Sequence, residues 1–296
     1  MVYEQIAANR RASLLVCLIF AAVVILLGWV LGEVWGVPWL GLAIALGISL
    51  GSVYTAYYNS DQIVLRMSGA RPLLKAEHPH LFNSVEGLAI AAGIPAPRCY
   101  VIGDSAPNAF ATGRDPAHGV VCVTTGLLDK MNRLQLEGVV AHEMSHIKNL
   151  DTRLQVLVAV LVGTTVLLSD WILRSMFYGR RGRRERVRGG QGMAILLVVG
   201  LVLALLAPLI AQLLRLAISR RREYLADASA ALLTRYPEGL AGALEKLAAD
   251  TEPLEAANRA TAHLYIVNPL KGESRWQSLF DTHPPIADRV RRLRSM

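Results

Sequence analysis

Residues 132–148 read NRLQLEGVVAHEMSHIK, and this stretch decides how the rest of the chain is interpreted. Apolar residues recur at helical spacing from Leu136 to Ile147. Asn132 is a suitable N-cap, and Gln135 three residues later makes a variant of the capping box. The pattern predicts a helix that begins after Asn132 and carries the five residues HEMSH.

This pentad predicts a metal site. His142 and His146 are four residues apart, so they share one helix face and can present both imidazoles to the same metal ion. Glu143 lies beside them and remains free to act as a general base on water. We expect one Zn²⁺ ion per chain from these ligand types, although other divalent ions could bind the same donors in vitro.

A zinc hydrolase needs a third protein ligand. Glu223 and Asp227 share a helix face at i, i+4, as a ligand and its hydrogen-bonding partner would. The alternative is that both are surface acids that pair with the preceding arginines. The candidates beyond the HEMSH helix are Glu223, Asp227, Glu238, His263 and His283.

The composition excludes a purely soluble protein. Of 296 residues, 53% are hydrophobic and only 18% are charged, against about 25% charged in a typical soluble domain. Leu14–Leu31 and Trp39–Tyr57 carry no charge, and each is long enough to cross a membrane. The first run is longer than a signal-peptide core, so we expect it to be retained. Three cysteines without CxxC spacing exclude a disulfide scaffold and a cysteine-based metal site.

The distribution of basic residues predicts the topology. Arg10 and Arg11 precede the first run, and the turn before the second run has no Lys or Arg. The positive-inside rule then places the N-terminus and the segment after Tyr58 in the cytoplasm. Two further apolar runs, at 154–169 and 193–218, predict a second hydrophobic hairpin, and we expect the HEMSH helix to continue into it. Full crossing and shallow insertion of this hairpin both remain open.

Most of the positive charge is local. Seven arginines and one glutamate between residues 174 and 188 supply six of the eight net charges. A charge confined to one segment argues against a nucleic-acid-binding protein. Two interpretations of Arg180–Arg188 remain, contact with anionic lipid headgroups and a solvated loop.

The segment between the hydrophobic parts reads as a small α+β domain. A helix is predicted over residues 81–92, and short strands are predicted at 99–102, 108–112 and 120–124. We therefore predict a mainly α integral membrane protein with two N-terminal transmembrane helices. A zincin-like α+β metalloprotease domain with a small β-sheet follows, and the second hydrophobic hairpin is inserted between the zinc ligands. The predicted parts are residues 1–60, 61–153, 154–218 and 219–296.

Four motifs occur in a characteristic order: PNAFATG at 107–113, HEMSH at 142–146, ExxxD at 223–227 and THPP at 282–285. With them the chain resembles, over nearly its whole length, the HtpX family of bacterial heat-shock metalloproteases. More distantly it resembles the eukaryotic CAAX prenyl endopeptidases. The resemblance implies a multi-pass inner-membrane zinc endopeptidase with its active site facing the cytoplasm. Its substrates would be misfolded or damaged membrane proteins, cleaved as part of quality control and the stress response.

The resemblance also implies residue roles. Glu143 would be the general base, and His283 would stabilise the oxyanion. An extended peptide would be added as a strand along Asn108, Ala109 and Phe110. The implied metal ligands are His142, His146 and Glu223, and the implied supporting residues are Asp227, which orients a ligand histidine, and Arg289.

Three other functions are compatible with parts of the sequence. A prenyl-peptide protease is disfavoured by four apolar runs in place of a larger helical chamber. An intramembrane protease is disfavoured because HEMSH precedes an apolar run and does not lie within it. A non-catalytic membrane metal sensor, adaptor or transporter is disfavoured because the first two apolar runs contain no acidic or basic residue.

Overall fold

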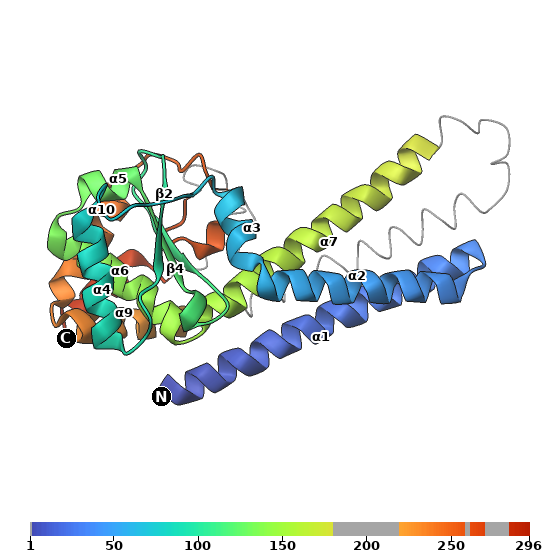
Figure 1. Cartoon of the computed structure of the whole chain (residues 1–296), viewed down its shortest axis with the longest axis horizontal. Helices are drawn as coiled ribbons and strands as arrows, with labels where there is room; N and C mark the ends of the chain where they lie inside the picture. The colour runs from blue at the N-terminus through green and yellow to red at the C-terminus, as the bar shows by residue number, and fades with distance from the viewer. Residues whose placement is uncertain (1, 180–218, 258–260, 270–283) are drawn as a thin grey trace. The chain divides into compact units, whose positions relative to one another are not determined.

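A computed structural model describes residues 2–179, 219–257, 261–269 and 284–296 (Figure 1). The chain forms two compact units. The first contains residues 1–11, 58–156 and 217–296, and the second contains residues 12–57 and 157–216. The fourth predicted apolar run, Arg180–Arg188 and His283 all lie outside the described residues.

Two long helices account for the hydrophobic N-terminal part. They are α1 (Val2–Trp35) and α2 (Pro38–Tyr58). Within the part that the structure describes, these are the two helices long and apolar enough to cross a membrane. Large apolar side chains stand exposed along both, including Leu14 at 61% and Trp39 at 82%. Water would not favour this exposure, whereas lipid would. The two predicted membrane helices are therefore confirmed as candidates.

Small residues bring α1 and α2 together. A Cβ atom added at Gly41 would overlap the carbonyl oxygen of Gly28, and one added at Gly32 would lie 2.8 Å from the Cα of Pro38. Gly28 and Gly32 are four residues apart on α1, as Gly41 and Ala45 are on α2. Such spacing lets the backbones of two membrane helices approach closely.

The third apolar run is helical. It belongs to α7 (Asp151–Gly179). Its predicted partner run lies outside the described residues, so the second hairpin stays a prediction.

The first unit holds a four-stranded mixed sheet. Its strands are β1 (Arg71–Pro72), β2 (Arg98–Ile102), β3 (Ala109–Thr112) and β4 (Val120–Thr124), in the order β1-β2-β4-β3. β2 and β4 run parallel, and the other two pairs are antiparallel. All five residues of β4 are buried, which matches their continuous apolar sequence. The three predicted strands are confirmed, and β1 is an addition to them.

Helices pack around this sheet. α4 (Pro79–Ala92) ends at Gly93, which has a left-handed φ of 68° as a helix C-cap commonly does. Among the described residues of this unit, the other helices are α3 (Ser60–Met67), α5 (Thr125–Lys130), α6 (Arg133–Lys148), α9 (Arg220–Thr234), α10 (Pro237–Ala249) and α11 (Ile286–Leu293), with short 3₁₀ turns η1 (Pro116–His118) and η2 (Ala262–Leu264).

α6 is the central helix of the first unit. Its predicted capping box is present, because Asn132 accepts from the Gln135 backbone while the Gln135 side chain accepts from the Asn132 backbone. α6 packs against α4, α9, α10 and β3. A Cβ at Gly138 would lie 2.6 Å from the backbone nitrogen of Leu240, so only glycine allows α10 to lie this close. These contacts fix the helix that carries HEMSH.

The prediction that the HEMSH helix continues into the third apolar run is wrong. α6 ends at Lys148, and Leu150 adopts a left-handed φ of 60° before α7 begins at Asp151. For a residue other than glycine this conformation costs roughly 1–2 kcal/mol. The side chain of Leu150 is only 5% exposed, so its packing offsets that cost. The break turns the chain and brings Asp151 back towards α6.

The close approach of α1 and α2 can be tested with a matched pair of glycines. Gly41→Leu should lower the stability of the hairpin by about 1–3 kcal/mol, since the added side chain overlaps the facing backbone. Gly47→Leu on the same helix should change little, because a Cβ there meets nothing within 4 Å. Thermal unfolding of the full chain in detergent would measure both. Equal losses in the two variants would contradict the packing described here.

Candidate metal centre

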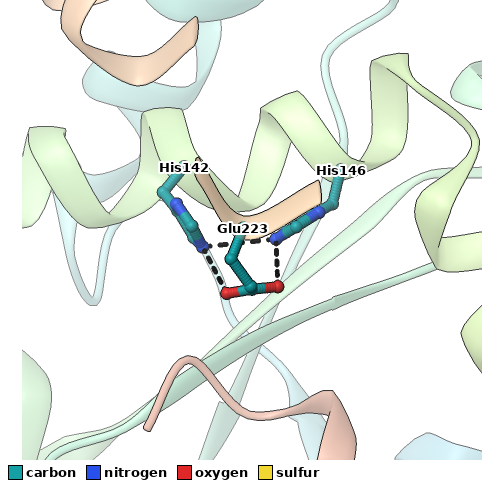
Figure 2. A group of neighbouring side chains, drawn as sticks. All are labelled: His142, His146 and Glu223. Atoms are coloured by element: carbon teal, nitrogen blue, oxygen red, sulfur yellow. Dashed lines mark hydrogen bonds and ion pairs between the residues drawn. The ribbon is translucent and has the colours of Figure 1, made fainter. Parts of the chain in front are cut away.

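Two histidines on α6 define the centre of the site. His142 and His146 are 0% and 5% exposed, and their Nε2 atoms lie 3.2 Å apart. Figure 2 shows both rings pointing towards the carboxylate of Glu223, which comes from α9. The two helices that carry these residues pack against each other. Burial of all three side chains separates the site from bulk water.

The donor geometry fits a tetrahedral metal ion. Glu223 Oε2 lies 3.7 Å from His142 Nε2, and Glu223 Oε1 lies 3.5 Å from His146 Nε2. Ligand atoms about 2.0–2.1 Å from a tetrahedral zinc ion are roughly 3.3–3.4 Å apart. The three measured separations of 3.2, 3.5 and 3.7 Å are close to that value.

A carboxylate stands behind each imidazole. Asp227 Oδ1 lies 3.0 Å from His142 Nδ1, and Asp151 Oδ2 lies 3.0 Å from His146 Nδ1. In a neutral imidazole the Nδ1 hydrogen is then donated to the carboxylate, and the Nε2 lone pair faces the centre. Two lone pairs and a carboxylate that converge in this way repel one another unless a cation lies between them.

The net charge of the buried cluster also favours a bound cation. Four carboxylates, two guanidinium groups and the two imidazoles are each at most 6% exposed. With neutral imidazoles, as metal ligation requires, the cluster carries a net charge of minus two, which one divalent cation balances. The charged members are Glu143, Asp151, Arg222, Glu223, Asp227 and Arg289.

Protons compete for the same positions. Burial opposes protonation of His142, but the carboxylates of Asp227 and Glu223 outweigh this effect and raise the pKa of the imidazole to about 9. Burial also opposes protonation of His146, and Asp151 and Glu223 again raise its pKa. A metal ion that binds here displaces protons, so it binds more tightly at higher pH.

Arg289 links the C-terminal helix α11 to the site. Its side chain is fully buried and makes a two-pronged ion pair with Asp227, at 2.9 Å from Nε to Oδ2 and 2.7 Å from Nη2 to Oδ1. Asp227 is thereby held between His142 and Arg289. Because desolvation of the guanidinium is outweighed by Asp227 and Glu223, the pKa of Arg289 is raised and the group stays charged.

Glu143 follows His142 on α6 and is 2% exposed. Its sequence position places it beside the histidine pair, as the motif requires. His283, predicted to stabilise an oxyanion, lies outside the described residues.

The predicted substrate strand lies at the edge of the sheet. β3 is the last strand in the sheet order, and Asn108, Ala109 and Phe110 are all buried. The chain's own segment covers the outer side of this edge, because Ile266 N donates to Ala109 O and Phe110 forms an isolated bridge with Tyr265. A peptide could pair at these positions only after that segment moves, so their assignment to substrate stays a prediction.

The other candidates for the third ligand have different surroundings. Glu238 pairs with Arg294 at the surface, and His263 Nε2 lies 3.3 Å from the carbonyl oxygen of Gln155. Among the described residues, the group that could hold a metal ion is His142, His146 and Glu223.

One supporting residue was missed from the sequence. Asp151 is fully buried and holds His146 in the same way as Asp227 holds His142. The signal available was an acid at the start of a helix, five residues after the second histidine. In a continuous helix, a residue five positions after His146 would lie on a different face from it, so helix spacing gives Asp151 no role beside that histidine.

Two buried histidines on an HExxH helix face a buried glutamate from a second helix, and two candidate membrane helices precede them. This is the arrangement of a membrane-bound metalloprotease. The chain belongs to peptidase family M48, whose model matches residues 75–296. The protein is therefore a peptide-bond hydrolase of the metalloprotease class.

Relatives of known name are similar over the full chain. A protease HtpX homolog of Dictyoglomus thermophilum is 52% identical, covering 99% of this chain and 94% of the relative. One of Ligilactobacillus salivarius is 41% identical over the whole of both chains. The crystal structure of S. mikatae Ste24p has a similar fold, with a TM-score of 0.51 and 19% identity over 98% of this chain and 67% of that one. The predicted family is confirmed.

Arg289 provides a test of the buried charge cluster. Arg289→Leu should destabilise the protein by about 3–5 kcal/mol, because it leaves the carboxylate of Asp227 buried without its partner. Arg291→Leu on the same helix should have little effect, since Arg291 is 77% exposed and its ion pair with Asp288 lies at the surface. Chemical unfolding in detergent would compare them. A similar loss in both would show that α11, and not the buried ion pair, determines the effect.

Proposed function

We propose that the protein is a zinc-dependent endopeptidase with His142, His146 and Glu223 as the metal ligands. The observation that carries this proposal is the convergence of two Nε2 atoms, 3.2 Å apart, on the Glu223 carboxylate, with a second carboxylate behind each ring. Nitrogen and oxygen donors in this number leave a fourth position open, as catalytic zinc sites do.

Zinc, when bound, would act as a Lewis acid towards a peptide carbonyl and a water molecule. Glu143 would take the proton from the attacking water and deliver it to the departing amine nitrogen. Asp227 and Asp151 would hold the two histidines in the tautomer that presents Nε2. His283 is proposed to stabilise the oxyanion from the family resemblance alone.

The proposed substrates are misfolded or damaged membrane proteins. Two candidate membrane helices keep the protease unit at a bilayer, where such substrates would be encountered. An unfolded segment could supply the extended backbone that strand addition requires. Residues 108–110 are proposed as the edge that receives it, after displacement of the segment around Tyr265.

The proposed location is the cytoplasmic side of a bacterial inner membrane. Residues 1–11 belong to the same compact unit as the metal centre. This supports the proposal that the centre and the N-terminal segment lie on the same side of the membrane. Arg10 and Arg11, just before the apolar run, favour the cytoplasm for that side.

Glu143→Gln tests the catalytic assignment. The variant should retain zinc and lose cleavage of an unfolded protein by at least about a hundredfold, because the amide cannot accept the proton. Glu137→Gln makes the same chemical change on the same helix and should leave the rate unchanged. Proteolysis and bound zinc would be measured together in detergent. Zinc bound to a wild-type protein that cleaves nothing would favour the sensor or adaptor alternative, and no bound zinc would overturn the proposal.

The topology can be tested with single cysteines. Ala8→Cys and Leu74→Cys, at exposed positions, should react with an impermeant thiol reagent from the cytoplasmic side, and Val37→Cys in the turn should react from the other side. Burial raises the pKa of Cys99 to about 11, so the native thiol there should stay unreactive. Wild-type vesicles give the background signal. Labelling of Ala8→Cys and Leu74→Cys from opposite sides would contradict the shared location.

A further inference from the structure

Asn9 is a buried amide in the N-terminal part of α1. It lies five residues before Leu14, where the uncharged run begins, and its side chain is 1% exposed. It belongs to the same compact unit as the metal centre. Asparagine is a weak helix former, and a buried amide is costly unless its hydrogen bonds are made. The hydrogen bonds of this side chain therefore explain why a buried asparagine is tolerated here.

The amide of Asn9 is fully used. Its Nδ2 donates to Asp151 Oδ1 at 2.6 Å and to the carbonyl oxygen of Asn149 at 2.8 Å. Its Oδ1 accepts from Arg222 Nη1 at 3.1 Å. If the amide were flipped, Oδ1 would face the oxygen atoms of Asp151 and Asn149 and would repel them. These contacts therefore fix the orientation of the amide.

These partners lead directly to the proposed ligands. The other oxygen of Asp151 lies 3.0 Å from His146 Nδ1. Arg222 immediately precedes Glu223 at the start of α9. Asn9 thus links the start of α7, where Asp151 contacts His146, to the first turn of α9, which carries Glu223.

We propose that Asn9 is a positioning residue of the metal centre. Its amide holds Asp151 and Arg222 so that His146 and Glu223 keep their spacing, and the N-terminal segment is therefore part of the catalytic unit. The match to the peptidase family begins only at residue 75, so this contribution lies outside the matched region. The proposal rests on the proposed zinc function.

Asn9→Asp is the decisive variant. It keeps the shape of the side chain and replaces the Nδ2 donor by an oxygen that faces the oxygens of Asp151 and Asn149. Loss of a partner behind a ligand histidine typically weakens metal binding 10–100-fold. Asn9 is one hydrogen bond further out, so we expect zinc affinity to fall about tenfold. Asn9→Ala should lower zinc affinity less than Asn9→Asp does, since it removes the hydrogen bonds without adding repulsion. Chelator competition on the full chain in detergent would measure zinc affinity.

A positioning role also predicts a kinetic signature. Both Asn9 variants should lower kcat at limiting zinc, leave KM for an unfolded protein unchanged, and recover with excess zinc. Ala8→Asp, which places the same charge at the exposed neighbouring position, should bind zinc as the wild type does. If Asn9→Asp fails to fold, Asn9→Ala still provides the affinity measurement.

Three results would overturn the assignment. Wild-type zinc affinity in the Asn9 variants, with or without a lower melting temperature, would show a merely structural role. A loss in Ala8→Asp equal to that in Asn9→Asp would show that added charge, and not the amide, weakens binding. A wild-type chain without zinc would overturn the proposed function and this assignment with it, whereas the first two results leave the proposed function intact.

Discussion

The structure depends on the close approach of two imidazole nitrogens and a carboxylate in a buried space, which needs a metal ion or protons to balance the charge. His142, His146 and Glu223 approach as closely as ligands of one small cation do. Each histidine is backed by an aspartate, and one of these aspartates is in turn paired with the buried Arg289. Such a cluster is costly to bury unless every charge has a partner. The surrounding elements are arranged to supply those partners.

The membrane part and the protease part place their apolar side chains differently. In the hairpin of α1 and α2, apolar side chains point outward while glycines allow the two backbones to meet. In the other unit, apolar side chains fill the interior around β4 and α6, and the charged cluster is the exception. The membrane helices account for the low overall charge of the sequence. The metal centre accounts for the concentration of buried charge around α6.

The sequence predicted the local features and missed the long-range ones. The capping box at Asn132, the histidine pair and the i, i+4 pair Glu223 and Asp227 follow from helix periodicity, which is a local rule. The break at Leu150 carried no signal, because the left-handed position is occupied by leucine and not by glycine. Without the break, Asp151 could not be assigned to His146. The partners that link Asn9 to the metal centre, Asp151 and Arg222, lie more than a hundred residues away, and no spacing rule reaches them.

The long reach of the cluster has a consequence for biosynthesis. Its members extend from Asn9 in the N-terminal helix to Arg289, more than 140 residues after the two histidines. A ribosome releases the earlier histidines long before it releases the arginine that neutralises Asp227. A nascent chain that has emerged only as far as the two histidines therefore lacks a part of its own metal centre.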